Sequence, residues 1–262
     1  MMRPCVLVFA GSDPGAGAGL QADLQAIAAH GAHALTVVTA VTVQDNDRVY
    51  SVNPVSPDLV RQQAQALIDK ISIAAVKIGI PGSPDNARVI AELLEQLKSR
   101  RPDLPVVLDT VLASGHGNAL SRGDARAALQ LLMPFATLVT PNLPEAAALS
   151  GGEPEIGAQA ERLLQSCPNV LIKGGHGSGP EVVNTWFARD GRQSWTWPRI
   201  GGEFHGTGCT LASAIAAQLA TGANLTHALE SAQAYVHRAL ERAYTIADGQ
   251  RIPERQTMKE AR

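Results

Sequence analysis

Short runs of apolar residues alternate along the chain with longer segments in which apolar residues recur at helical spacing. The short runs are rich in Val and Ile, and polar residues or glycine follow them. This alternation is typical of β-α-β units, whose parallel strands form a central sheet that helices cover on both faces. We expect strands at residues 5–10, 35–43, 74–80, 105–109, 137–140 and 169–173.

The segments between these runs carry apolar stripes that indicate amphipathic helices. The stripes are Val60, Ala64, Leu67 and Ile71; Ile90, Leu93, Leu94 and Leu97; and Ile156, Ala160, Leu163 and Leu164. An Ala-rich helix is expected from Gly206 to about Ala220, and a last helix from Thr226.

The texture changes after residue 173. Residues 181–188 and 192–197 flank Asp190-Gly191, a turn sequence typical of a hairpin, so antiparallel strands are expected near the C-terminal edge. The fold class predicted is therefore a three-layer α/β/α domain with a mainly parallel sheet. We expect one domain over residues 1–248 and a charged, frayed tail over residues 249–262.

Composition narrows the functional classes. The chain has 262 residues, 45% of them hydrophobic, which is enough for one large core. Its net charge is -2 and its 22 basic residues are scattered, so no nucleic-acid partner is expected. The apolar runs are too short to span a membrane or to act as a signal peptide. Three cysteines at unrelated spacings suit a reducing cytoplasm.

A glycine-rich turn from Gly11 to Gly19 joins the first strand to a helix. In open α/β sheets, ligands bind at the carboxyl ends of strands, where glycines allow close approach to the backbone. The turn has neither a Walker Lys-Ser or Lys-Thr nor the dinucleotide spacing. A tight turn without a ligand remains the alternative.

A second glycine motif, Gly206-Thr207-Gly208-Cys209, opens the Ala-rich helix. Free N–H groups and the helix dipole at such a position can hold a phosphoryl group. A thiol there is expected to have a lowered pKa, which makes Cys209 a candidate base. Close helix packing around a small core cysteine is the alternative, and we favour the anion site.

Charged residues also follow strands near the middle of the chain. Asn142 and Glu145 are spaced as a capping box, and from their spacing alone the cap is the favoured interpretation. A carboxylate at this position could also hold magnesium. Asp109 and Lys173 end two other strands, and their convergence on one sheet edge would form a phosphate and metal site. Lys77 lies within a strand and is left out of the site as a structural ion-pair candidate.

These motifs, in this order, resemble the hydroxymethylpyrimidine and phosphomethylpyrimidine kinase family of the ribokinase-like superfamily. The matching motifs are Ala10-Gly-Ser-Asp-Pro, Gly17-Ala-Gly-Leu-Gln-Ala-Asp23, Thr39-Ala-Val-Thr-Val-Gln44, Lys77-Ile-Gly, Thr140-Pro-Asn-Leu-Pro-Glu145, Lys173-Gly-Gly-His176 and His205-Gly-Thr-Gly-Cys-Thr-Leu211. The resemblance implies phosphorylation of hydroxymethylpyrimidine and of its monophosphate in thiamine biosynthesis. It also implies ATP as phosphoryl donor, Mg²⁺ and a homodimer.

The resemblance also implies roles for individual residues. Gly11, Asp23 and Gln44 would bind the aminopyrimidine, and Cys209 would act as base beside the anion hole of Gly206, Thr207 and Gly208. Asp109, Asn142 and Lys173 would bind ATP and its phosphates, and Glu145 would serve the metal.

The chain departs from the family pattern in several loops. Residues 14–17 lack the usual hydroxyl residue, Thr110 replaces a proline, residues 113–117 are short and lack the usual lysine, and residues 80–83 replace a longer turn. These loops bear most on the second phosphorylation, whose acceptor is a phosphate monoester. Two alternatives stay open: a pyridoxal or pyridoxine kinase, and a pyrimidine-binding regulatory protein with weak catalysis.

Overall fold

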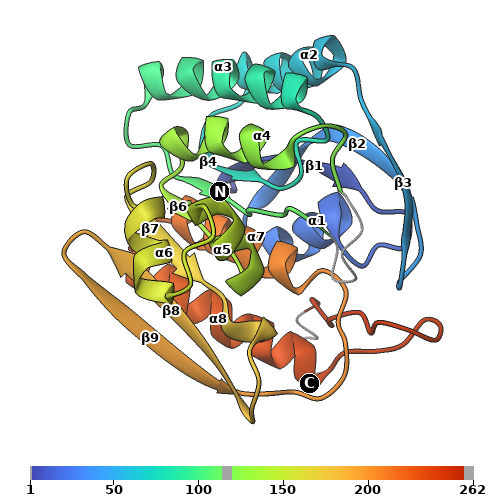
Figure 1. Ribbon diagram of the computed structural model, residues 1–262. Coiled ribbons are helices and arrows are strands. Elements are labelled where there is room, and N and C mark those ends of the chain that lie inside the picture. The colour runs from blue at the N-terminus through green and yellow to red at the C-terminus, as the bar shows by residue number, and fades with distance from the viewer. Residues whose placement is uncertain (1, 114–119, 257–262) are drawn as a thin grey trace.

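The predicted alternation of strands and helices forms a nine-stranded sheet with helices on both faces (Figure 1). The computed structural model describes residues 2–113 and 120–256. The strands are β1 (Cys5–Ser12), β2 (His33–Gln44), β3 (Val49–Pro54), β4 (Ile73–Ile78), β5 (Val106–Leu108), β6 (Leu138–Val139), β7 (Asn169–Ile172), β8 (Glu181–Ala188) and β9 (Gly191–Pro198). The helices are α1 (Gly19–Ala29), α2 (Pro57–Ile68), α3 (Pro84–Arg100), α4 (Ala125–Leu132), α5 (Leu143–Ser150), α6 (Ile156–Leu163), α7 (Thr207–Ala220) and α8 (Leu225–Glu241), with 3₁₀ turns η1 (Met133–Phe135) and η2 (Gly174–His176).

The sheet is parallel in its centre and antiparallel at both edges. Its order is β3-β2-β1-β4-β5-β6-β7-β8-β9, and the strands from β2 to β7 pair in parallel. The expected hairpin of β8 and β9 is confirmed at one edge. At the other edge β3 pairs antiparallel with β2, a strand that the sequence pattern did not predict.

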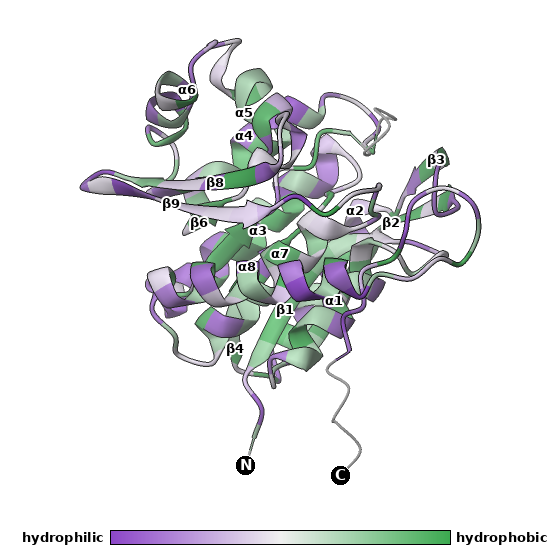
Figure 2. Ribbon diagram, turned by 90° about the horizontal axis from the view of Figure 1, so that it is seen from below, coloured by the Kyte–Doolittle hydropathy of each residue, from purple (hydrophilic) through white to green (hydrophobic). Residues whose placement is uncertain are grey.

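Alternating side chains of the central strands supply the two cores. On β1, Leu7 and Phe9 pack against the layer of α2 to α6, whereas Val6, Val8 and Ala10 face α1, α7 and α8. Because successive side chains of a strand point to opposite faces, an unbroken apolar run is buried on both. Figure 2 shows the same contrast, with β1 and β4 largely hydrophobic and the outer strand β9 pale to hydrophilic.

Serine and aspartate caps fix where several helices begin. Ser56 accepts a hydrogen bond from the N–H of Leu59 at the start of α2, and Ser83 does so from Asn86 at the start of α3. A proline follows each serine, as is common at the first helical position. Asp124 caps the short helix α4, which the sequence reading also missed.

The expected fraying of the chain beyond Asp248 is wrong for its described part. Ile252 is 2% exposed and Arg255 is 1% exposed, and Ile252 pairs with Tyr244 in a β-bridge. A charged composition predicts exposure to solvent, but Arg255 donates hydrogen bonds to buried acceptors that are distant in sequence. None of the described helices is both long and apolar enough to cross a membrane.

Candidate active site

The carboxyl ends of the parallel strands open into a cavity of about 640 Å³. Because these strands share a direction, they deliver residues from distant parts of the chain to one edge of the sheet. The predicted residues that line the cavity are Gly11, Gln44, Asp109, Asn142, Glu145, Lys173, Gly206, Thr207, Gly208 and Cys209. Asp23 is the predicted residue that the structure does not bring to this wall.

An ion pair between Asp109 and Lys173 lies against the first turn of α7. Lys173 Nζ donates to Asp109 Oδ1 at 3.0 Å, and Thr140 Oγ1 donates to the same oxygen at 3.2 Å. A Cβ built on Gly208 would lie 3.2 Å from Lys173 Nζ, so the glycine leaves room for the ammonium beside the helix backbone. Burial lowers the pKa of Lys173, but Asp109 and Glu145 raise it above its ordinary value, which keeps the ammonium charged.

The predicted capping box at the start of α5 is confirmed. Asn142 Oδ1 accepts from the N–H of Glu145 at 2.9 Å, and Glu145 Oε2 accepts from the N–H of Asn142 at 2.8 Å. The cap does not exclude a second role, because Glu145 also lines the cavity. Burial raises the pKa of Glu145 to about 7, with Asp109 adding to the rise and Lys173 opposing it.

The acidic residues fit a magnesium ion that is held mainly by phosphates. Asp109 Oδ2 is buried and has no hydrogen-bond partner among the described residues. The described part of the chain contains no cluster of three or more His, Cys, Asp or Glu side chains that could form a protein cage for a metal. Mg²⁺ usually takes one or two carboxylates together with waters and substrate phosphates, so Asp109 and Glu145 could serve as its protein ligands.

The start of α7 presents unused backbone N–H groups to the cavity. Gly206 has a φ of 83° and occupies the N-cap, and a Cβ there would lie 2.0 Å from the carbonyl oxygen of Gly17. Glycine is therefore required at this position. The first N–H groups of a helix have no intrahelical acceptor, and the helix dipole makes this end favourable for an anion.

The predicted low pKa of Cys209 is wrong. Burial raises the pKa of this thiol to about 11, and although Lys77 opposes the rise, Asp23 and Asp109 add to it. The helix terminus favours a thiolate, but desolvation and two nearby carboxylates outweigh that effect. Cys209 is therefore a neutral thiol at neutral pH.

Asp23 lies behind the cavity wall and holds Lys77. Both side chains are completely buried, and Lys77 Nζ donates to the two carboxylate oxygens of Asp23 at 2.8 and 2.9 Å. Ser213 Oγ also donates to Asp23 Oδ1 at 2.7 Å. Asp23 is fully buried by these partners and does not line the cavity, and its contact with the pyrimidine stays a prediction.

Lys77 is a cavity residue that the sequence reading left out. It lines the cavity, and a Cβ on Gly79 would lie 3.0 Å from its Nζ. Burial lowers its pKa, but Asp23, with smaller effects of Cys209 and Asp109, raises it above the ordinary lysine value. The signal was available, since a lysine inside a fully apolar strand needs a buried anion.

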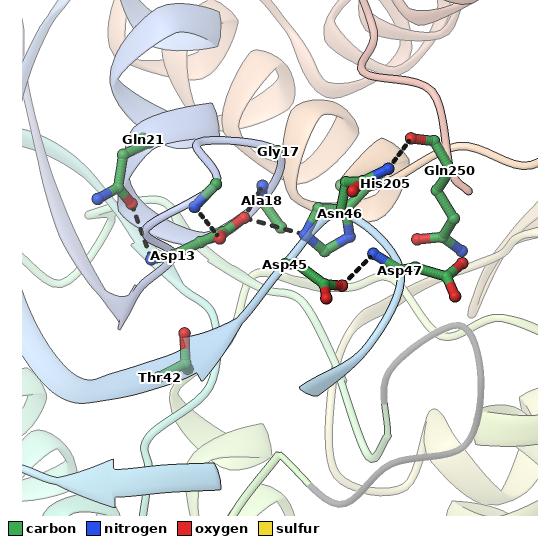
Figure 3. Close-up of polar contacts among 12 residues, drawn as sticks. Asp13, Gly17, Ala18, Gln21, Thr42, Asp45, Asn46, Asp47, His205 and Gln250 are labelled. Atoms are coloured by element: carbon green, nitrogen blue, oxygen red, sulfur yellow. Dashed lines mark hydrogen bonds and ion pairs between the residues drawn. The ribbon is translucent and has the colours of Figure 1, made fainter. Parts of the chain in front are cut away.

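The glycine-rich turn is closed by Asp13, which the sequence reading gave no role. Asp13 Oδ1 accepts from the N–H of Gly15 at 2.8 Å, and its Oδ2 accepts from the N–H of Ala18 at 2.7 Å. His205 Nε2 lies 2.9 Å from the same Oδ2, so this carboxylate links the turn to the approach to α7 (Figure 3). Burial would raise the pKa of Asp13, but the hydrogen bonds from His205, Ala18 and Gln44 together lower it.

The inner face of β2 forms the neighbouring wall. Thr42 and Gln44 lie on this face, and Thr42 Oγ1 donates to the carbonyl oxygen of Ser12 at 2.9 Å. Val41 and Val43, on the opposite face of the strand, are about half exposed. Gln44 thus lines the cavity, and its contact with the pyrimidine stays a prediction.

A buried amide network supports the other end of the cavity. Asn184 Oδ1 accepts from the N–H of Gly174 at 2.9 Å, and Asn184 Nδ2 donates to Gln233 Oε1 at 2.9 Å. Trp197 Nε1 donates to the same Gln233 oxygen at 3.3 Å. This network fixes the loop after Lys173, and the sequence pattern did not reveal it because its members lie on β8, β9 and α8. The departure noted at residues 113–117 falls mostly outside the described residues.

Comparison with known proteins agrees with this geometry. The family model described as phosphomethylpyrimidine kinase matches residues 13–253. A hydroxymethylpyrimidine/phosphomethylpyrimidine kinase from Rhizobium meliloti is 40% identical over 257 residues, covering 95% of each chain.

Two solved structures share the fold. The phosphomethylpyrimidine kinase from Clostridium difficile superposes with a TM-score of 0.77 at 32% identity, covering 91% of this chain and 100% of that one. An ADP complex of Bacillus subtilis pyridoxal kinase superposes with a TM-score of 0.87 at 26% identity, covering 97% and 98%. The predicted ribokinase-like fold is thereby confirmed, and the match over nearly the whole chain shows that this protein belongs to the phosphomethylpyrimidine kinase family.

Proposed function

We propose that this cavity transfers the γ-phosphoryl group of ATP first to the hydroxymethyl oxygen of 4-amino-5-hydroxymethyl-2-methylpyrimidine and then to the resulting monophosphate, in thiamine biosynthesis. The observation that carries the proposal is the convergence at Gly208. The charged amine of Lys173, the Asp109 carboxylate and the free N–H groups of α7 meet there, in the same cavity as Gln44. These groups suit a transferring phosphoryl group with an acceptor on one side and a nucleotide on the other.

In the first step, the acceptor oxygen forms a bond to the γ-phosphorus while the bond to the bridging oxygen of ADP breaks. The hydroxyl proton is released. Such transfer depends on positioning and charge neutralisation more than on covalent chemistry. The N–H groups of Gly206, Thr207, Gly208 and Cys209 would receive the oxygens of the transferred group, and Lys173 would neutralise their charge.

At the acceptor end, Gln44 and the backbone of Gly11 would bind the pyrimidine. Cys209 would lie beside the acceptor hydroxyl, where it acts as a base only if substrate binding lowers the pKa of its thiol. Lys77, held by Asp23, provides a positive charge near both Cys209 and Asp109. A loose transition state loses the hydroxyl proton late, which makes a strong base unnecessary.

At the nucleotide end, Asn142 and Lys173 would contact the phosphates of ATP directly, and Asp109 and Glu145 would reach them through Mg²⁺ or its waters. Magnesium would supply further charge neutralisation on the phosphates. The buried, unpartnered Asp109 Oδ2 supports this assignment.

Pyridoxal is the second candidate acceptor, because the pyridoxal kinase structure superposes over nearly the whole chain. A weakly catalytic binding protein is disfavoured, since Asp109, Glu145, Lys173 and Cys209 are all retained in one cavity.

The test is ADP release with ATP and magnesium, offering hydroxymethylpyrimidine, its monophosphate and pyridoxal separately. Turnover of both pyrimidines supports the proposal, and turnover of the first alone removes the second step. Pyridoxal as sole acceptor, or silence with all three, overturns the pyrimidine assignment.

We further propose that the protein works in the cytoplasm as a homodimer. ATP is available there, and the three cysteines are free. Val41, Val43 and Tyr50 on β2 and β3 are 51%, 52% and 61% exposed, an apolar edge that a second copy could cover. Sedimentation equilibrium should show a dimer that Val43→Lys dissociates. We also propose that residues up to 256 belong to the one kinase domain.

A further inference from the structure

Arg255 is a buried cation that the proposed mechanism does not use. Its side chain is among the largest fully buried ones, and it lies beyond the last helix in a segment that its charge alone would leave in solvent. Tyr235 Oη on α8 donates to the carbonyl oxygen of Arg255 at 2.7 Å. The N–H of Glu254 donates to the carbonyl oxygen of Ala239 at 2.9 Å. The backbone of this segment is therefore anchored to α8.

The guanidinium connects the two glycine loops of the cavity. Arg255 Nε donates to Thr210 Oγ1 at 2.8 Å, and its Nη2 donates to the carbonyl oxygens of Gly17 and His205. Thr210 Oγ1 in turn donates to the carbonyl oxygen of Gly206 at 2.7 Å. One side chain thus holds the glycine-rich turn and the N-cap of α7 in a fixed relation.

The loops it connects touch without space for any side chain. A Cβ on Gly17 would lie 2.1 Å from His205 Cδ2, and a Cβ on Gly206 would lie 2.0 Å from the carbonyl oxygen of Gly17. A small shift of either loop would move the N–H groups of Gly206 to Cys209. Misplacement of catalytic groups by about 1 Å can cost on the order of 100-fold in rate.

Among the described residues, no carboxylate contacts the guanidinium of Arg255, and Asp23 acts on it only through longer-range electrostatics. No carboxylate in that part of the chain forms an ion pair with it, and its Nη1 is buried without a partner. A buried cation without an anion is costly, and it creates a positive potential that is weakly screened. The N–H groups of α7, where an anion is expected, begin one turn from Thr210.

We propose that Arg255 is a positioning residue for phosphoryl transfer, whose guanidinium fixes the anion hole at α7 against the glycine-rich turn and places positive charge behind it. The inference rests on the proposed function of that anion hole. A residue that acts in this way should affect kcat far more than the KM of a neutral acceptor.

The test compares Arg255→Met, which removes the charge at similar length, with Arg255→Lys, which keeps the charge but loses the fork of donors. For Arg255→Met we expect kcat to fall about 100-fold, with KM values for hydroxymethylpyrimidine and ATP within about threefold. The kcat of Arg255→Lys should be about tenfold higher than that of Arg255→Met, because the charge is kept. Arg251→Met is the matched control in the same segment, because the Arg251 guanidinium packs over the Phe204 ring and donates to the carbonyl oxygen of Gly201 without bonding to either glycine loop. The kcat of this variant should stay within about twofold.

Unchanged kcat in folded Arg255→Met overturns the proposal, as does an equal loss in Arg255→Lys or in Arg251→Met. If Arg255→Met does not fold, Arg255→Gln replaces it as the neutral variant. The affinity for inorganic phosphate, measured as the rise of the melting temperature during a phosphate titration, separates this inference from the substrate assignment. If the wild type shows no turnover but the neutral variant binds phosphate about tenfold more weakly than the wild type does, the Arg255 inference stands and the substrate assignment is rejected. Equal phosphate affinity rejects the Arg255 inference.

Discussion

Individual residues show how burial decides chemistry that sequence position alone does not. Cys209 has the helix N-terminus that should favour a thiolate, yet burial raises its pKa to about 11. Glu145 has an ordinary capping-box position, yet burial raises its pKa to about 7. Both shifts follow from the low polarisability of the surroundings, which penalises the charged form.

The ionisation of Cys209 can be measured by alkylation. In a Cys5→Ser, Cys167→Ala background, the rate of reaction with iodoacetamide should rise with pH without levelling off below about pH 10, because the thiol titrates at about 11. An inflection between pH 7 and 9 would contradict this.

Cys209→Ala should fold normally and lose most turnover if substrate binding makes the thiol a base. Unchanged turnover would leave the step to the anion hole.

Gln44 is expected to act on the acceptor alone. Gln44→Ala should raise the KM for hydroxymethylpyrimidine about tenfold, the effect of a lost hydrogen bond, and leave the KM for ATP within about twofold. Initial rates with each substrate varied in turn provide the measurement. An equal rise in both KM values would remove Gln44 from the acceptor site.

Glu145 should trade stability for function. Its folded pKa of about 7 exceeds the ordinary glutamate value of 4.5, so the folded state binds more protons between these values and stability falls as pH rises through that window. Glu145→Gln can keep the cap, and it should melt higher than wild type at pH 8, lose that advantage near pH 4.5, and lose at least about tenfold in kcat. Melting curves at several pH values test it, with exposed Glu161→Gln as control. A lower melting temperature at pH 8 would reject this account.

At the scale of elements, the contact between the turn before α1 and the N-cap of α7 shapes the cavity. Asp13 and His205 join these two segments on one side, and Asn46 Nδ2 donates to the carbonyl oxygens of Asp248 and Gln250 on another (Figure 3). Four segments are thereby held in two pairs: the turn at Asp13 with the approach to α7, and the turn at Asn46 with the C-terminal segment. Each contact is between groups that are far apart in sequence.

Gly206→Ala tests how closely these elements must approach. The substitution combines a φ of 83° with a Cβ 2.0 Å from a carbonyl oxygen, so we expect it to cost about 3 kcal/mol or more. Gly222→Ala is the control, since its φ is 93° but nothing lies within 4 Å of the added Cβ, and it should cost about 1 kcal/mol. Urea unfolding measures both. Equal costs would mean that the contact contributes nothing beyond backbone strain.

At the scale of the whole molecule, the C-terminal segment completes the cavity rather than trailing from it. A chain that ends after Gln256 keeps Ile252 and Arg255, and we expect its urea midpoint and its rate of ADP release to equal those of the full chain. A chain that ends after Asp248 loses a buried isoleucine and the buried arginine, which should lower stability by about 3 kcal/mol or more and abolish most turnover. Urea midpoints and ADP release test both chains. Equal stability would show that the segment is dispensable.

The sequence by itself determined the parallel sheet and the edge at which ligands bind. Apolar runs of strand length and helical stripes are local patterns, and parallel strands necessarily bring their carboxyl ends to one side. The places of Asp109 and Lys173 on this edge were predictable for that reason. The capping box at Asn142 was readable because both of its partners lie within one helical turn.

The tertiary structure decided what depends on distant partners. Strand β3 is a short edge strand that ends in Asn53-Pro54, and its pairing with β2 is seen only in the folded sheet. Asp23 is fully buried because Lys77 and Ser213 lie beside it, 54 and 190 residues away along the chain. Arg255 is buried because acceptors 45 and 238 residues away surround it. Local pattern records the period of an element, whereas burial, pKa and ion pairing depend on neighbours that only folding assembles.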